Sequence, residues 1–148
     1  MRKVLFVPLN TNHVLIFQGI MKSLNCGYEA LCHDRISEAS QYHTEDLLNK
    51  LNIPFRHFPH VIKRSPLAGL PARFIDFFKI KREIKKILGQ ITPRVIVFAI
   101  DNDPIARLCI REARKRGIRT VLIQEALIRH NEYDQRRKYF SDHFYALL

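Results

Sequence analysis

Apolar positions alternate between two spacings along the chain. Short strand-like runs occur at 3–9, 28–34, 54–62, 94–101, 119–124 and 143–148. Between them, apolar residues recur every three or four positions at 14–25, 44–51, 72–88 and 104–116, which is the spacing of one helical face. A weaker helical pattern covers 133–141. The pattern therefore predicts strands and helices in alternation.

Local signals support these boundaries. Thr44 precedes two acidic residues, which is typical of the first turn of a helix, and Asp103 precedes a proline in the same way. Gly27, Gly89 and Gly117 each follow a helical segment, so we expect all three to end helices.

Alternating strands and helices predict a parallel sheet that is covered on both faces. The expected class is α/β, a Rossmann-like three-layer sandwich with five or six parallel strands in the order 3-2-1-4-5. Residues 1–148 are expected to form a single domain, because the sequence shows no repeat and no linker.

Length and composition narrow the class of protein. The chain has 148 residues, of which 47% are hydrophobic, so it is globular rather than disordered. The apolar runs are too short to cross a bilayer, and the first residues lack the pattern of a signal peptide. Cys26, Cys32 and Cys109 have no metal-like spacing, which indicates reduced core thiols in a cytoplasmic protein.

Polar residues gather after several predicted strands. In an open parallel sheet, ligands bind beyond the carboxyl ends of the strands, above all between the first and fourth. The candidate substrate-binding residues there are Asn10, Thr11, Asn12, Asp101, Asn102, Gln124 and Glu125. Loops in this class of fold are polar in any case. The alternative interpretation is therefore that these residues only connect elements and cap helices, above all Asp103.

His13 is the candidate catalytic residue. It lies where the first strand turns into the first helix, so the positive end of that helix should keep its ring neutral. A neutral imidazole can take a proton from a hydroxyl, or it can donate to a hydroxyl or a phosphate. The alternative is that His13 only caps its own helix.

Several common signatures are absent. The sequence has no GxGxxG, no GxxxxGK[ST] and no GxSxG. His57 and His60 lie three apart on a predicted strand and so should point to opposite faces. We therefore expect no cofactor and no metal.

Positive charge is concentrated in one segment. Residues 61–88 carry eight basic and two acidic residues, within a net charge of +11 for the chain. One interpretation is a solvated basic face beside a wide stripe that packs in the core, formed by Phe74, Phe77, Ile80, Ile84 and Ile87. The alternative interpretation is a surface that binds an anionic membrane or a lipid-linked acceptor, formed by Phe74, Phe78, Lys79, Lys81, Arg82 and Lys85. Nucleic acid is disfavoured, because no nucleic-acid motif accompanies the charge.

Three segments carry a resemblance to a known family. Residues 7–14, 47–59 and 92–125 resemble the N-terminal Rossmann-type half of GT-B glycosyltransferases and of the related UDP-N-acetylglucosamine 2-epimerases. In those enzymes Gly-His often stands at the positions of Asn12 and His13, and a Glu-Ala-Gly turn at 125–127. Asn12, Arg119 and Leu127 depart from that pattern.

The resemblance implies a nucleotide-sugar enzyme with two such domains and its active site between them. This chain would be the acceptor-side half, with His13 as the base, and would be inactive without the second domain. The implied role is glycosyl transfer in polysaccharide or glycolipid synthesis, in the cytoplasm or at the inner face of the membrane. An epimerase-like domain, a small-ligand-binding domain and a basic membrane- or nucleic-acid-binding module remain the alternatives.

Overall fold

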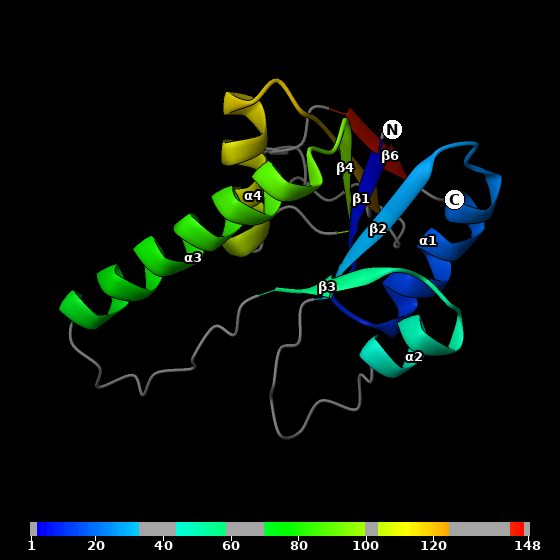
Figure 1. Cartoon of the computed structure of the whole chain (residues 1–148), viewed down its shortest axis with the longest axis horizontal. Coiled ribbons are helices and arrows are strands. Elements are labelled where there is room, and N and C mark those ends of the chain that lie inside the picture. Colours follow the sequence, from blue (N-terminus) through cyan, green and yellow to red (C-terminus); the bar gives the residue numbers. More distant parts are fainter. Residues whose placement is uncertain (1–2, 33–43, 59–69, 100–103, 125–142, 147–148) are drawn as a thin grey trace, which may run out of the picture.

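The fold is built on one parallel sheet whose first strand is central. The structure, a computed structural model, describes residues 3–32, 44–58, 70–99, 104–124 and 143–146. The six strands, β1 (Lys3–Val7), β2 (Gly27–Cys32), β3 (Phe55–His57), β4 (Val95–Phe98), β5 (Arg119–Gln124) and β6 (His143–Ala146), lie in the order β3-β2-β1-β4-β5-β6 (Figure 1). All five pairings between neighbours are parallel. The predicted class and the order 3-2-1-4-5 are confirmed, and β6 extends the sheet beside β5.

Within the described residues, four helices cover the two faces of this sheet. They are α1 (Thr11–Ser23), α2 (Thr44–Lys50), α3 (Leu70–Ile91) and α4 (Pro104–Lys115). Consecutive residues of β1 are buried on opposite faces, since Leu5 packs with α3 and α4 while Phe6 packs with α1 and α2. Burial on both faces explains why the strands read as continuous apolar runs.

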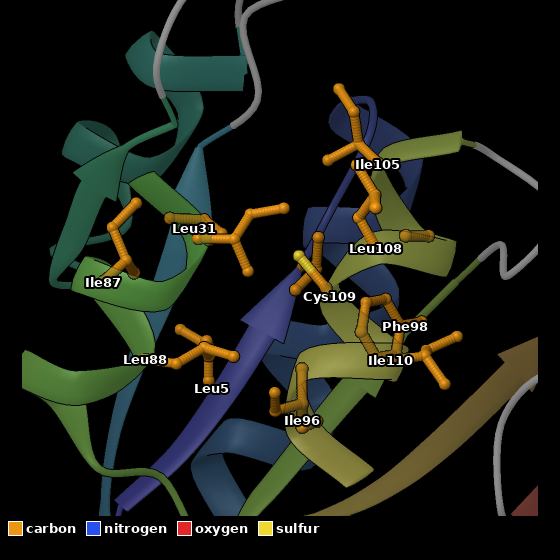
Figure 2. Packing of buried hydrophobic residues seen from close by; sticks show 14 of the residues in the cluster. Leu5, Leu31, Ile87, Leu88, Ile96, Phe98, Ile105, Leu108, Cys109 and Ile110 are labelled. Atoms are coloured by element: carbon orange, nitrogen blue, oxygen red, sulfur yellow. The ribbon is translucent and has the colours of Figure 1, made fainter. Parts of the chain in front are cut away.

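The core beneath α3 and α4 is the larger of the two. Figure 2 shows side chains from β1, β2 and β4 meeting those of the two helices. Ile84 and Leu88 of α3 are at most 2% exposed, as is Ile96 of β4. Arg116 donates from Nη2 to the carbonyl oxygen of Lys85 at 2.9 Å, which joins the end of α4 to α3.

Helix α3 is longer than the sequence predicts. It continues through Gly89 to Ile91, whereas we expected Gly89 to end it. Ile91 is 3% exposed, so its burial favours one more turn, and the helix stops at Thr92 with a φ of 46° before Pro93. At about 33 Å the helix is longer than the strands on which it packs. Its first half therefore extends beyond the sheet (Figure 1).

Two further predictions about loop residues were wrong. Gly27 is the first residue of β2, because α1 already ends at Ser23 and its C-cap, Leu24, has an extended backbone (φ −80°, ψ 130°). Cys26 is consequently exposed in the connection, whereas Cys32 and Cys109 are buried as expected. Gly117 does end α4, with a φ of 65° in the left-handed region that glycine tolerates.

Candidate functional site

The carboxyl edge of the sheet between β1 and β4 is the switch point of the strand order. These strands are parallel neighbours, with Val7 opposite Phe98, so the loops after them leave from the same edge. Helix α1 follows β1 onto one face, and α4 follows β4 onto the other. Divergence of the two following helices is what opens a crevice in folds of this class.

The loop after β1 is held by a compact set of hydrogen bonds. Asn10 is the N-cap of α1, and its Oδ1 accepts from the backbone amide of His13 at 2.9 Å. The His13 side chain folds back over the loop, and its Nδ1 accepts from the backbone amide of Leu9 at 3.1 Å. These two bonds run in opposite directions between the loop and the first turn, so they fix the loop against the helix.

The His13 ring lies in the interior. The residue is 2% exposed, and Nε2 lies 3.4 Å from Nδ2 of Asn10. Thr11 and Asn10 are half-buried, and Asn12 is exposed. Four of the predicted site residues therefore lie at the start of α1, Asn10 as its N-cap and Thr11, Asn12 and His13 in its first turn, and all but His13 are open to solvent to different degrees.

Of the other predicted binding residues, Gln124 alone lies within the part of the chain that the structure describes. Gln124 is the last residue of β5, which ends at the same edge of the sheet as β1 and β4. Asp101, Asn102 and Glu125 lie outside the described residues, as does Asp103. Whether the loop at 101–103 faces His13 thus stays a prediction.

The apolar part of the surface predicted on the long helix lies on the first half of α3, which extends from the sheet (Figure 1). Phe78 is 61% exposed and Ile75 is 52% exposed. Phe77, expected to pack in the core with Ile84 and Ile87, is also exposed (39%), because no described strand lies beneath this half of the helix. Its ring lies edge-on to that of Phe78, with centroids 5.7 Å apart.

Basic residues continue this surface along the helix. Lys79, Arg82 and Lys85 are exposed and Lys81 is half-buried. Phe78, Lys81, Arg82 and Lys85 follow the i, i+3, i+4, i+7 spacing of one helical stripe. The side chain of Phe74, the sixth predicted member, lies outside the described residues.

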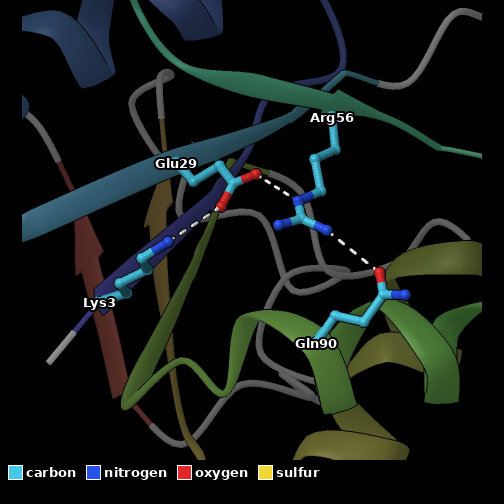
Figure 3. Close-up of polar contacts among 4 residues, drawn as sticks. All are labelled: Lys3, Glu29, Arg56 and Gln90. Carbon is cyan, nitrogen blue, oxygen red and sulfur yellow. Dashed lines mark hydrogen bonds and ion pairs between the residues drawn. The ribbon is translucent and has the colours of Figure 1, made fainter. Parts of the chain in front are cut away.

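A buried charge on the α3 side of the sheet was missed by the sequence analysis. Glu29 of β2 pairs with Arg56 of β3 and lies 3.7 Å from Nζ of Lys3 (Figure 3). Nη1 of Arg56 also donates to Oε1 of Gln90 on α3 at 3.1 Å. The signal was a single acid within the apolar run 28–32 and a single arginine in β3, but their pairing required the strand register. This network connects three strands to α3.

Two features that the described part of the chain lacks bear on the type of site. No group of three His, Cys, Asp or Glu side chains in that part could hold a metal ion. No helix in the same ranges has the length and apolarity needed to cross a bilayer.

Among the comparisons with known proteins, only the comparison with solved structures finds similar proteins, and these have the same fold. No protein-family model matches the chain, and no curated protein matches it. Solved structures that share its architecture include three sugar-nucleotide proteins. MurG from Acinetobacter baumannii has a TM-score of 0.57 at 16% identity, covering 84% of this chain and 34% of that one. UDP-GlcNAc 2-epimerase from Neisseria meningitidis, bound to UDP-GlcNAc, has a TM-score of 0.58 at 13% identity, covering 94% and 36%.

The third structure covers the most of this chain among the three. It is a putative UDP-N-acetylglucosamine 2-epimerase from Listeria monocytogenes, with a TM-score of 0.63 at 11% identity, covering 97% of this chain and 39% of that one. This chain thus spans little more than a third of the length of the structures it matches. Its fold is that of a GT-B-like Rossmann domain, similar to a part of MurG and of the UDP-GlcNAc 2-epimerases.

Proposed function

We propose that this chain is the N-terminal, acceptor-side domain of a GT-B glycosyltransferase that uses a nucleotide-sugar donor. The observation that carries the proposal is the loop Leu9–His13 at the switch point of a GT-B-like sheet, where this class binds ligands. A second Rossmann-like domain would hold the donor, since the matched structures are more than twice as long. The acceptor would belong to polysaccharide or glycolipid synthesis.

In this proposal the carboxyl edge supplies one wall of the active site. Asn10, Thr11, Asn12 and Gln124 would line it, together with Asp101, Asn102 and Glu125. A reaction between two substrates needs both walls, because catalysis depends on holding the reactants in register. The chain alone should therefore transfer no sugar and bind a nucleotide sugar weakly.

Titration of the labelled chain with UDP-N-acetylglucosamine tests this role. We expect amide shifts at 9–13 and near Gln124, with saturation only at millimolar ligand. A stand-alone ligand-binding domain would instead bind its own ligand tightly. Calorimetric binding of UDP-N-acetylglucosamine at micromolar Kd, about −8 kcal/mol, would contradict the acceptor-side assignment. Shifts confined to α3 or to the β3 edge would contradict the proposed site.

An epimerase-like domain is the second candidate. It is supported by the higher TM-score and the 97% coverage with the putative epimerase. The two candidates differ in what a protein with both domains would do. An epimerase converts UDP-N-acetylglucosamine to its 2-epimer with no acceptor present, whereas a transferase releases UDP only when an acceptor is added. Product analysis with and without acceptor separates them.

The surface of α3 supports a further part of the proposal, which is contact with anionic lipid at the inner face of the membrane. Phe78 and Ile75 are exposed apolar side chains, and Lys79, Lys81, Arg82 and Lys85 follow them. Each basic residue close to an anionic surface contributes about 1 kcal/mol, so four contribute about 4 kcal/mol. Insertion of the exposed Phe78 ring would add to this attraction.

Sedimentation with vesicles tests the lipid contact. The wild-type chain should bind vesicles that contain phosphatidylserine and should not bind purely phosphatidylcholine vesicles. Replacing Arg82 and Lys85 by glutamate should abolish binding, whereas the same reversal at Lys22 and Lys50 should weaken it only slightly. These two lysines are exposed on α1 and α2, so the control changes the net charge equally. Equal losses in both double variants would show that only net charge matters and would reject a defined surface.

A further inference from the structure

The geometry of His13 points to a role different from the general base that its position suggests. We propose that His13 is a positioning residue: its ring, fixed as the neutral Nε2–H tautomer, holds the β1–α1 loop through the Leu9 amide. The identity of the reaction rests on the proposed function, but the state of the ring does not. Three features of the loop support this role.

The first observation is the bond from Leu9. A backbone amide can only donate, so Nδ1 of His13, which accepts from it at 3.1 Å, carries no hydrogen. A neutral imidazole has one hydrogen, which must then be on Nε2. Nδ1, the nitrogen that could accept a proton in this tautomer, is already engaged by the chain itself.

The second observation is the neighbour of Nε2. Nδ2 of Asn10 lies 3.4 Å away, and a hydrogen bond from it would need Nε2 to be without hydrogen. That tautomer would place a hydrogen on Nδ1 opposite the Leu9 amide, at the shorter distance of 3.1 Å. The Asn10 amide cannot be turned to relieve this, because its Oδ1 accepts from the His13 amide at 2.9 Å. The shorter Leu9 contact therefore decides the tautomer.

The third observation is burial. With 2% of the residue exposed, the ring is buried rather than standing in an open cleft. A general base must come within hydrogen-bond reach of the hydroxyl that it deprotonates. In the described geometry His13 instead sets the direction of the backbone at 9–12, where Asn10, Thr11 and Asn12 are at least partly accessible. A transferase built on this loop would take its base from another residue.

Two isosteric variants separate the roles. In His13→Asn, the side-chain oxygen lies near the position of Nδ1 and can still accept from Leu9. In His13→Gln, the amide reaches toward the position of Nε2 and leaves Leu9 without its acceptor. The labelled chain gives two readouts, the nitrogen shifts of the His13 ring and the hydrogen exchange of the Leu9 amide.

We expect a pyridine-like shift at Nδ1 and a pyrrole-like shift at Nε2 in the wild-type chain. Exchange at Leu9 should be slow in the wild type and in His13→Asn, and at least tenfold faster in His13→Gln. A hydrogen on Nδ1, or equal exchange in the two variants, would overturn the proposal. Both readouts are independent of sugar transfer, so they can fail while the proposed function stands.

Activity provides the final comparison in a protein that also carries the second domain. A positioning role predicts that His13→Asn keeps turnover within about threefold of wild type while His13→Gln loses more. A general base predicts that both variants lose about 100-fold or more. Loss of turnover in His13→Asn with slow Leu9 exchange retained would therefore refute the positioning role. Absence of any sugar-nucleotide activity in the wild type would refute the proposed function instead.

Discussion

Removal of the Arg56 guanidinium should destabilise the fold more than removal of the Lys3 ammonium. Both side chains are 41% exposed and both face the Glu29 carboxylate, whose side chain is only 10% exposed. They differ in geometry. Arg56 donates from Nε at hydrogen-bond distance and also reaches Gln90, whereas Nζ of Lys3 lies 3.7 Å away. Arg56→Met and Lys3→Met keep the apolar stems and are a matched pair.

The magnitudes follow from burial on each side of the pair. Breaking a fully buried ion pair costs about 3–5 kcal/mol, whereas an exposed pair contributes about 0.2–1 kcal/mol. With one buried and one partly exposed partner, we expect about 2 kcal/mol for Arg56→Met. Lys3→Met should cost less than about 1 kcal/mol, because its contact is longer and it leaves Arg56 in place. In a domain of this size 2 kcal/mol corresponds to a Tm about 4–8 °C lower.

Urea unfolding followed by circular dichroism measures both variants, and a cycle with Glu29→Gln isolates the pairwise energy. The coupling between positions 29 and 56 should exceed that between 29 and 3. Equal costs for the two single variants would show that the register of β2 and β3, rather than this ion pair, holds the edge of the sheet. A stabilised Arg56→Met would refute the reasoning altogether.

Three further predictions concern stability and use the same unfolding assay. Ile84→Ala should cost about 3 kcal/mol, since the side chain is 1% exposed, whereas Phe78→Ala at 61% exposed should change stability by less than about 0.5 kcal/mol; similar values would mean that α3 packs differently. Gly117→Ala should lower the free energy of unfolding by about 1 kcal/mol, because its φ is 65°. Gly89→Ala should raise it by about 0.5 kcal/mol, because Gly89 lies inside α3. A change of the same sign in both variants would contradict the described backbone. Asn10→Ala should cost about 1 kcal/mol as the lost cap of α1, and an unchanged midpoint would exclude its capping bond.

The alternation of strands and helices was predictable because each element carries its own periodicity. β5 spans Arg119–Gln124 as expected, since a buried run is bounded by Gly117 on one side. Boundaries set by tertiary packing were not predictable. Helix α3 passes Gly89 because burial of Ile91 outweighs the helix propensity of one glycine, which differs from that of alanine by about 1 kcal/mol.

The place of His13 in the fold was predictable, whereas its hydrogen bonds were not. The position of His13 after the first strand followed from the pattern, and the structure puts it in the first turn of α1, next to the switch point of the sheet. The hydrogen bond that Nδ1 of His13 accepts from the Leu9 amide depends on the side chain folding back over the loop. No rule of sequence spacing describes this conformation. The exposure of Phe77 was missed for a similar reason, because helical periodicity does not show where the sheet beneath a helix stops.

The position of β1 in the middle of the sheet has a consequence for synthesis. Its partner on one side, β2, follows it closely in the chain, but Leu5 on the other side pairs with Ile96. During translation the first strand therefore has one edge of unpaired backbone groups until most of the chain has been made. Such an edge is a template for strands of other molecules. Nascent or truncated chains that stop before 95 should associate with one another, so chaperone contact with the growing polypeptide should persist until β4 emerges from the ribosome.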